Sequence, residues 1–231
     1  ALFQIGLIYS YATKREVKMK KLLLFVLVVI PLLFFNNSCE KSPTEPNDQD
    51  SIVAYKPNIY IYPNSTIDLS VEVFFPNGGE VIESIPTYDD QWEITVTPDG
   101  KIDNTYDYLF YECKMADLTQ QEYGWVIEVN KLEEFFSDNL LSSGFSENEI
   151  EDFIEHWIPR LTDSGFYEIY PQYKSMLDEM VSIKYSIEPD HFYRLFYLIK
   201  GREDNRLELL SPNIEVANRD KYFAIEWGVI L

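Results

Sequence analysis

Hydrophobic and polar residues alternate without interruption between residues 67 and 73. Asp, Ser and Glu occupy the positions between four hydrophobic residues: Ile67, Leu69, Val71 and Val73. A period of two places the two kinds of residue on opposite faces of a β-strand, so that one face is buried and the other meets solvent. Because half-buried strands are typical of antiparallel sheets, this stretch favours an antiparallel β scaffold.

Other segments repeat the strand pattern. In 92–96 (WEITV) the alternation recurs, and a Pro-Asp-Gly turn follows it. Prolines bound the hydrophobic stretch 57–63, and since proline donates no ladder hydrogen bond, this stretch is predicted to be an edge strand. Asn-Gly-Gly at 77–79 is a hairpin turn signal. Further strands are predicted at 106–113, 124–129, 181–187, 192–200 and 221–230.

Two helices are predicted midway along the chain. The first begins at the capping pair of Asn130 and Glu133 and ends at Gly144. The second begins at the capping box of Ser146 and Glu149, and hydrophobic residues continue it at helical spacing. Together with the strands, these helices predict an α+β fold that is mainly antiparallel β and sandwich-like, with an inserted helical hairpin.

The chain is divided into a targeting region and one domain over 53–231. The uncharged run at 22–35 has fourteen residues, too few for a membrane span but suited to a signal peptide core. Residues 19–38 are therefore predicted to be a lipoprotein-type signal peptide that ends before a lipidated Cys39. Ordinary signal cleavage and an uncleaved anchor are the alternatives. Residues 39–52 are interpreted as a flexible tether and residues 1–18 as upstream translated sequence or a cloning remnant.

A lipidated Cys39 would hold the protein at a membrane of the bacterial cell envelope, outside the cytoplasm. After Cys39 the chain has 14 basic and 38 acidic residues, a net charge of −24. Such a chain has no general attraction for nucleic acid or for anionic lipid, so membrane contact is expected through the lipid anchor alone. Cys113 is the one cysteine left for the domain and is expected to be a small buried hydrophobe.

The motifs of common catalytic and cofactor sites are absent from the sequence. There is no nucleophile elbow and no glycine-rich phosphate loop, so no cofactor is expected. Asp152 and His156 share one helix face, but a firm metal site needs about four ligands, and a solvated helix face is the preferred interpretation. No metal site is predicted. His191, next to Asp190, is interpreted as a turn residue.

Two glutamates in predicted strands carry the strongest chemical signal. Glu112 and Glu226 lie among aromatic residues, although glutamate is disfavoured in strands and is seldom buried without a partner. Arg194, in the strand HFYRLFY, is the expected partner, because a guanidinium pairs with carboxylates. The preferred interpretation is a structural pair or triad. The alternatives are glycoside hydrolysis with Glu112 and Glu226 as acid and base, or a site that binds a sugar or peptide.

Aromatic residues are abundant, with 17 tyrosines and four tryptophans. Strands with aromatic residues on both faces cannot bury all of them in one core, so some are expected at the surface. Exposed tyrosines suit stacking on a glycan or contact with a protein, although tyrosine is also simply a good strand former. The candidate binding residues are Arg194, Tyr60, Tyr62, Tyr193, Tyr197 and Trp227.

Five segments occur in a fixed order: KPNIYIYP (56–63), YDYLFYE (106–112), SENEIEDFIEHWIPRL (146–161), EPDHFYRLFYLIK (188–200) and IEWG (225–228). Together they resemble an uncharacterised family of secreted bacterial proteins with a K-P-x-I-Y-x-Y-P opening, a Y-x-Y-L-[FY]-[WY]-E strand and a closing E-W-G motif. The resemblance spans nearly all of 53–231 and implies an extracytoplasmic role without a known reaction. Members often end in E-W-G-G, whereas Val229 follows Gly228 here.

Three functions are compatible with these observations. The favoured one is an envelope-anchored, non-enzymatic domain that binds a glycan or an envelope protein through an aromatic strand face. The second is a hydrolase of envelope polysaccharide that uses paired glutamates. The third is a structural or assembly lipoprotein without a small ligand.

Overall fold

The structure, a computed structural model, describes residues 51–231. The domain predicted at 53–231 lies within this range. The predicted signal peptide at 19–38, the lipidation site Cys39 and the upstream residues 1–18 lie outside the described residues, as does all but the end of the predicted tether. These interpretations stay predictions.

The strands of the described part form two sheets. The large sheet contains, from edge to edge, β3 (Gly79–Ile85), β5 (Leu109–Ala116), β1 (Ser51–Tyr62), β10 (Phe223–Ile230), β9 (His191–Arg202), β7 (Phe166–Tyr173) and β6 (Trp125–Glu128). Its neighbours are antiparallel apart from β9 and β10, which run parallel. The small sheet is antiparallel and contains, in order, β4 (Trp92–Val96), β2 (Ile67–Phe74) and β8 (Ser182–Tyr185).

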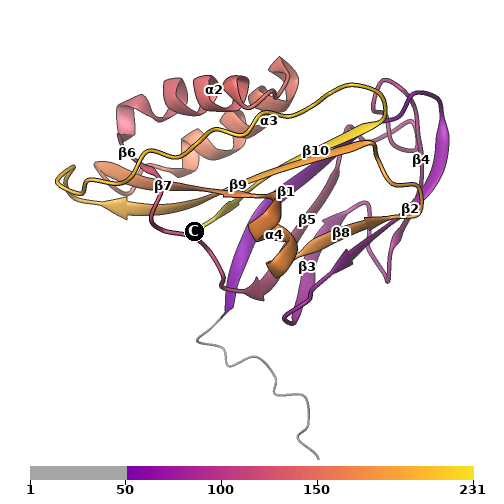
Figure 1. The fold of residues 1–231 in the computed structure, drawn as a ribbon, viewed down its shortest axis with the longest axis horizontal. Coiled ribbons are helices and arrows are strands. Elements are labelled where there is room, and N and C mark those ends of the chain that lie inside the picture. The colour runs from indigo at the N-terminus through magenta and orange to yellow at the C-terminus, as the bar shows by residue number, and fades with distance from the viewer. Residues whose placement is uncertain (1–50) are drawn as a thin grey trace, which may run out of the picture. The chain divides into compact units, whose positions relative to one another are not determined.

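The helices complete a layered arrangement. They are α2 (Leu132–Ser142), α3 (Glu147–Trp157) and α4 (Lys174–Met180), with the 3₁₀ turns η2 (Val129–Lys131) and η3 (Ile158–Arg160). The hairpin of α2 and α3 covers one face of the large sheet, and the small sheet packs on the other (Figure 1). The predicted α+β, sandwich-like fold with an inserted helical hairpin is confirmed. Within residues 51–231, no helix has the length and hydrophobicity that crossing a membrane requires.

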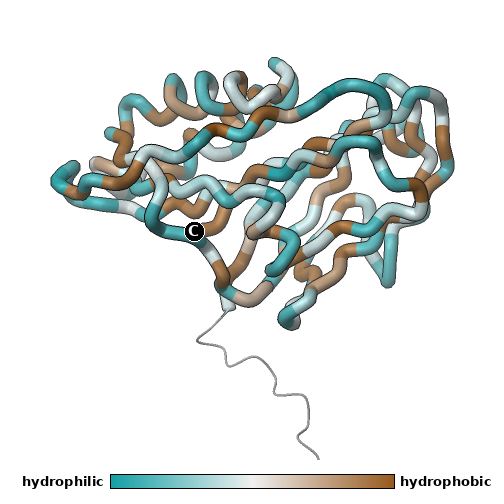
Figure 2. The backbone as a smooth tube through the Cα atoms, in the orientation of Figure 1, coloured by the Kyte–Doolittle hydropathy of each residue, from teal (hydrophilic) through white to brown (hydrophobic). Residues whose placement is uncertain are grey.

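The central strands send alternate side chains into two cores. On β1, Ile59 and Ile61 join the core shared with the small sheet, whereas Tyr60 between them joins the core under the helical hairpin. Hydrophobic residues recur in this way along the strands of both sheets (Figure 2). Burying one such side chain contributes about 1.5–3 kcal/mol, so strands that are buried on both faces hold the three layers together. Cys113 is fully buried, as predicted.

Predictions that rest on a few neighbouring residues are confirmed. In β2, Leu69 and Val71 are buried and Asp68 is exposed, as the alternation predicts. The capping box of Ser146 and Glu149 forms at the start of α3, with both of its hydrogen bonds present. Each of these features depends on residues only a few positions apart, so the sequence contains the whole cause.

The prediction of an edge strand at 57–63 is wrong. β1 lies between β5 and β10 and pairs with both. Both pairings slip in register just before Asn58, so Pro57 falls in a bulge where no ladder N–H is required. The preceding residue, Lys56, has a φ of 54°, a left-handed conformation that is uncommon for a residue with a side chain.

Two predictions fail at the ends of elements. Residues 75–78 form a turn in which the N–H of Gly78, at a φ of 82°, donates to the carbonyl of Phe75, and Gly79 begins β3. Because β2 and β3 belong to different sheets, the turn joins two layers and closes no hairpin. Asn130 and Glu133 do not cap a helix. Asn130 lies within η2, and α2 begins at Leu132 without a side-chain cap.

The parallel pair of β9 and β10 requires a long return connection between them. Residues 203–222, here called the crossover segment, provide it without forming a helix or a strand of the sheets, and they run alongside the helical hairpin (Figure 1). The N–H of Ala217 donates to the carbonyl of Ser143 at 2.9 Å. The guanidinium of Arg219 binds both carboxylate oxygens of Glu149, at 2.8 and 3.0 Å. Connections of this length without regular structure are uncommon in compact domains.

Candidate functional site

Arg194 and Glu226 form the predicted ion pair in the interior. They are register partners on β9 and β10, and both side chains are fully buried. Arg194 Nε lies 2.5 Å from Glu226 Oε2, and its Nη1 lies 2.9 Å from Asp178 Oδ1. Nη1 also donates to the carbonyl oxygen of Val181. Despite burial, these negative neighbours keep the pKa of Arg194 above its ordinary value. The pair is confirmed as a structural contact.

Glu112 is not part of this cluster, so of the predicted pair or triad the structure contains the pair of Arg194 and Glu226. The preceding residue, Tyr111, donates its hydroxyl to Glu226 Oε1 at 2.7 Å. Because successive side chains of a strand point to opposite faces, Glu112 is directed away from Glu226. Glu112 is instead the register partner of Glu83, and burial together with that negative charge raises its pKa. The paired glutamates that glycoside hydrolysis would require are therefore not assembled.

The prediction of an exposed aromatic face is wrong for most of its residues. Tyr60, Tyr193, Tyr197 and Trp227 are buried, and Tyr62 is half-buried. All five belong to the core under the helical hairpin or pack against it. The helices supply acceptors for these polar groups. Tyr60 donates to Asp152 at 2.8 Å, Tyr62 to Glu149 at 2.7 Å and Tyr197 to Asn139 at 2.6 Å. The sequence did not show that the hairpin would cover this face of the sheet.

A pocket of about 450 Å³ opens beside the bulge in β1. Its walls come from β1, β3, the residues before and within β5, and α3. The lining residues are Lys56, Ile85, Thr105, Tyr106, Asp107, Tyr108, Phe110 and Asp152. We call it the Lys56 pocket.

Lys56 is placed by the left-handed backbone of the bulge. Its ammonium lies 4.7 Å from the ring centre of Tyr108 and 4.8 Å from that of Phe110, within cation–π range. It also donates to Asn58 Oδ1 at 3.2 Å and to the Tyr108 hydroxyl at 3.3 Å. Burial lowers the pKa of Lys56, although the negative charges of Asp152 and Glu112 oppose this effect.

Asp152 approaches the same pocket from α3. It accepts the hydroxyl of Tyr60, and burial raises its pKa despite that hydrogen bond and the nearby charge of Lys56. One helical turn later, burial and the positive charges of Arg160 and Lys56 lower the pKa of His156 to about 4. The interpretation of Asp152 and His156 as a solvated helix face is therefore wrong, because both are partly buried.

Asn58 is a buried polar residue beside Lys56. Its side chain is fully buried and its Oδ1 accepts from Lys56, but its Nδ2 has no hydrogen-bond partner among residues 51–231. A buried polar group without a partner costs about 1–3 kcal/mol, so native structures contain few of them. Shifted pKa values that gather around a pocket are typical of functional sites.

The Lys56 pocket was missed by sequence reasoning, although the sequence contained one indication of it. Three of the segments on which the predicted resemblance rests, 56–63, 106–112 and 146–161, each contribute at least one residue to its lining. These segments are far apart in the chain, and only the fold shows that they meet. In the described part of the chain, no group of three His, Cys, Asp or Glu residues is arranged to hold a metal ion.

Comparison of the chain with known protein families, with curated proteins and with solved structures gives no match. The chemistry of the Lys56 pocket must therefore be inferred from its own geometry. The pocket offers an ammonium, two carboxylates, tyrosine hydroxyls and aromatic rings within one concave surface. This combination can hydrogen-bond a ligand rich in hydroxyl groups while packing against its apolar faces.

Proposed function

We propose that the domain is a non-enzymatic module that binds a glycan in the Lys56 pocket. The observation that carries the proposal is the convergence of aromatic and charged side chains there. Tyr106 and Tyr108 are half-buried, so each offers part of its ring to a ligand. The C–H faces of a sugar ring would pack on these rings, and its hydroxyls would bind Asp152 and Lys56.

Binding is favoured over catalysis by the state of the carboxylates. Glu226 is fully buried and bonded to Arg194 and Tyr111, so no substrate can reach it. Asp152 already accepts a hydrogen bond from the hydroxyl of Tyr60. A hydrolase based on Glu112 and Glu226 therefore loses its acid–base pair, whereas a binding site needs only the donors and acceptors that the pocket already presents.

The proposed location follows from the targeting region. A lipid on Cys39 and a polar tether would hold the domain at the surface of a membrane in the bacterial envelope, outside the cytoplasm. Envelope polysaccharides are the glycans within its reach there. The strongly acidic surface argues against nucleic acid as the ligand.

The proposal is tested by titrating the full chain with two soluble probes, cellotetraose and chitotetraose, by calorimetry and saturation-transfer NMR. At least one probe is expected to bind saturably. Tyr106→Ala and Asp152→Asn should each weaken that binding about tenfold, the loss expected when one aromatic or charged contact is removed. Asp163→Asn, an exposed acid outside the pocket, is the matched control. No saturable binding, or equal binding by all variants, would overturn the proposal.

A further inference from the structure

A second pocket, of about 310 Å³, lies under the crossover segment. Its lining residues are Gln120, Tyr123, Pro171, Tyr173, Ser175, Met176, Pro212, Asn213 and Glu215. We call it the Tyr173 pocket. It shares no lining residue with the Lys56 pocket and is made by β7, the start of α4, the loop before β6 and the crossover segment.

One wall of the Tyr173 pocket is fixed by a network of amides. The side-chain amide of Gln120 donates to the carbonyls of Tyr123 and Pro171 at 2.8 and 2.9 Å, and its oxygen accepts from the N–H of Tyr123 at 2.9 Å. Gln172, which is fully buried, holds the backbone of Gln120 at both its N–H and its carbonyl. The pocket is thus preformed and does not depend on a ligand to shape it.

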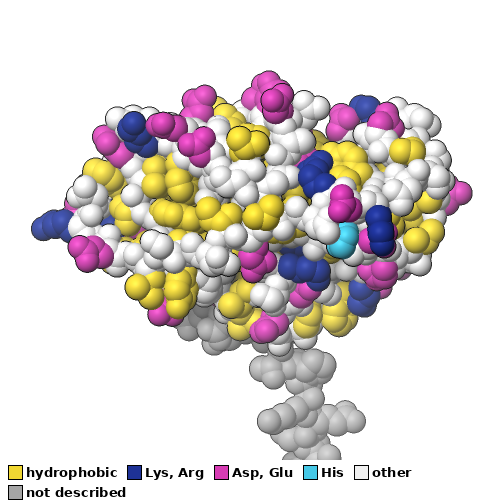
Figure 3. Space-filling view, turned by 45° about the horizontal axis from the view of Figure 1, so that its top comes forward, with side chains coloured by type: hydrophobic (Ala, Val, Ile, Leu, Met, Phe, Trp, Pro, Cys, Tyr) yellow, Lys and Arg dark blue, Asp and Glu magenta, His cyan; other side chains and the backbone are white. Residues whose placement is uncertain are grey.

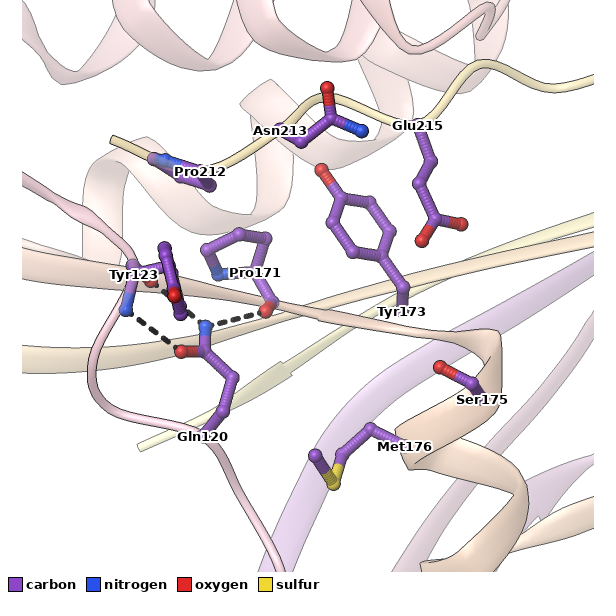
Figure 4. Close-up of a pocket in the computed structure, with 9 residues that line it drawn as sticks. All are labelled: Gln120, Tyr123, Pro171, Tyr173, Ser175, Met176, Pro212, Asn213 and Glu215. Atoms are coloured by element: carbon purple, nitrogen blue, oxygen red, sulfur yellow. Dashed lines mark hydrogen bonds between the residues drawn. The ribbon is translucent and has the colours of Figure 1, made fainter. Parts of the chain in front are cut away.

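The remaining walls combine aromatic rings with one carboxylate. Figure 4 shows the rings of Tyr123 and Tyr173 on either side of Pro171, with the carboxylate of Glu215 beside Tyr173. The Tyr173 hydroxyl is buried beside the backbone of Glu215. Burial raises the pKa of Tyr173, although a hydrogen bond with the backbone of Glu215 opposes this effect. The ring of Tyr173 is thus held in place as one wall of the pocket.

The surroundings of the pocket select the sign of the ligand's charge. On the face shown in Figure 3, acidic and basic side chains are both scattered, and hydrophobic side chains form a band across the middle. The crossover segment exposes Leu210, Ile214 and Val216. The whole chain has a net charge of −20, so an anionic ligand would be repelled and a cationic one attracted.

From this geometry we infer that the Tyr173 pocket binds a primary ammonium carried on a hydrocarbon chain. The hydrocarbon chain packs on Pro171 and on the rings of Tyr123 and Tyr173 that flank it, and the ammonium binds the Glu215 carboxylate and the face of a ring. Proteins commonly recognise organic cations with the faces of aromatic rings, and here a carboxylate lies beside the rings. Such a group can come from a lysine side chain of a protein partner or from a free diamine.

The test titrates the full chain with Nα-acetyl-lysine methylamide, with its uncharged norleucine analogue and with 1,5-diaminopentane, by ligand-observed NMR. The lysine probe is expected to bind at least about tenfold more tightly than the norleucine probe, since only it can use cation–π and ionic contacts. Binding of the lysine probe alone assigns the pocket to a protein partner, and equal or tighter binding of the diamine assigns it to a free amine. Equal affinity for the lysine and norleucine probes, or no saturable binding of any probe, overturns the inference.

Variants locate the binding. Glu215→Gln and Tyr123→Ala should each weaken the lysine probe about five- to tenfold, whereas Tyr123→Phe, which keeps the ring, should not. Glu208→Gln changes an exposed acid of the same crossover segment outside the pocket and is the matched control. If Glu208→Gln weakens binding as much as Glu215→Gln does, the attraction is a general effect of charge and the assigned site is wrong. Glycan binding by these variants should be unchanged, so the two proposals fail independently.

Discussion

Replacing Arg194 by methionine is expected to destabilise the fold by about 3–5 kcal/mol, the usual cost of removing one partner from a buried ion pair. The variant leaves Glu226 charged and fully buried, with only the hydroxyl of Tyr111 still bonded to it. It also removes one of the two ion-pair partners of Asp178, but Asp178 is one-third exposed and keeps its ion pair with Lys174, so this loss adds little. The carbonyl of Val181 loses its donor as well.

The double variant Arg194→Met/Glu226→Leu should recover much of this loss, because it leaves no uncompensated charge in the core. Replacing a buried ion pair by hydrophobic residues of similar volume is often neutral or stabilising. We therefore expect the double variant to be more stable than Arg194→Met alone. The two substitutions should be non-additive by at least about 2 kcal/mol, as residues in one network are.

Urea unfolding of the full chain, followed by tryptophan fluorescence, measures these differences. With a slope of about 2 kcal/mol per molar urea, a loss of 4 kcal/mol moves the midpoint by about 2 M. The matched control is Lys184→Met, which breaks the exposed Lys184–Glu72 pair at 2.9 Å and should cost less than about 1 kcal/mol. If Arg194→Met costs no more than this control at an unchanged slope, the buried cluster does not stabilise the fold. Should Arg194→Met fail to fold, Asp178→Asn gives a milder test of the same contact.

Three further predictions concern other parts of the domain. Gly228→Ala should cost about 1–3 kcal/mol, because the new Cβ would lie 2.9 Å from the buried ring of Phe196, whereas Gly165→Ala, with open space around it, should be nearly neutral by the same unfolding assay. Arg219→Met should cost about 2–4 kcal/mol and make the crossover segment a site of early cleavage in limited proteolysis; equal protection of variant and parent would contradict this. His156 has a pKa of about 4 in the fold and 6.5 in the unfolded chain, so between these values the unfolded chain binds a proton that the fold does not, and stability falls as the pH is lowered from 6.5 towards 4. Allowing for partial exposure, the loss is about 1–2 kcal/mol. His156→Gln should show a smaller loss between pH 7 and pH 4.5, and an identical pH dependence would refute the assignment.

The sequence predicted the local structure well and the neighbours of each strand poorly. The capping box at Ser146 and the buried positions of β2 follow from residues within one turn or one strand. The place of β1 does not, since Pro57 is a sound signal of an edge strand unless a bulge accommodates it. Whether a bulge forms depends on β5 and β10, which are distant in the sequence and impose the register shift from both sides.

The sequence predicted only part of the candidate site, because the remaining contacts depend on elements that are distant in the sequence. The pairing of Arg194 with Glu226 could be inferred from charge alone, because each needed a partner. Which residue of β5 joins Arg194 and Glu226 depends on which face of the strand each side chain occupies. Tyr111 and Glu112 are neighbours and point to opposite faces, and it is Tyr111 that contacts Glu226. Likewise, the tyrosines of β1 and β9 were assigned to the surface because nothing in their own strands shows that α2 and α3 lie over them.

The two proposed sites lie beside irregular parts of the chain, the bulge in β1 and the crossover segment. At Pro57 the bulge turns Lys56 out of the strand and places its ammonium over two rings, which a regular strand would not do. At the parallel pair of β9 and β10, the chain must return across the molecule, and part of that return forms one wall of the Tyr173 pocket. In a sheet that is buried on both faces, regular positions are occupied by packing. Irregular segments bring further side chains beside the sheet, and each pocket takes part of its lining from a bulge or a loop rather than from Tyr60, Tyr62, Tyr193 or Tyr197.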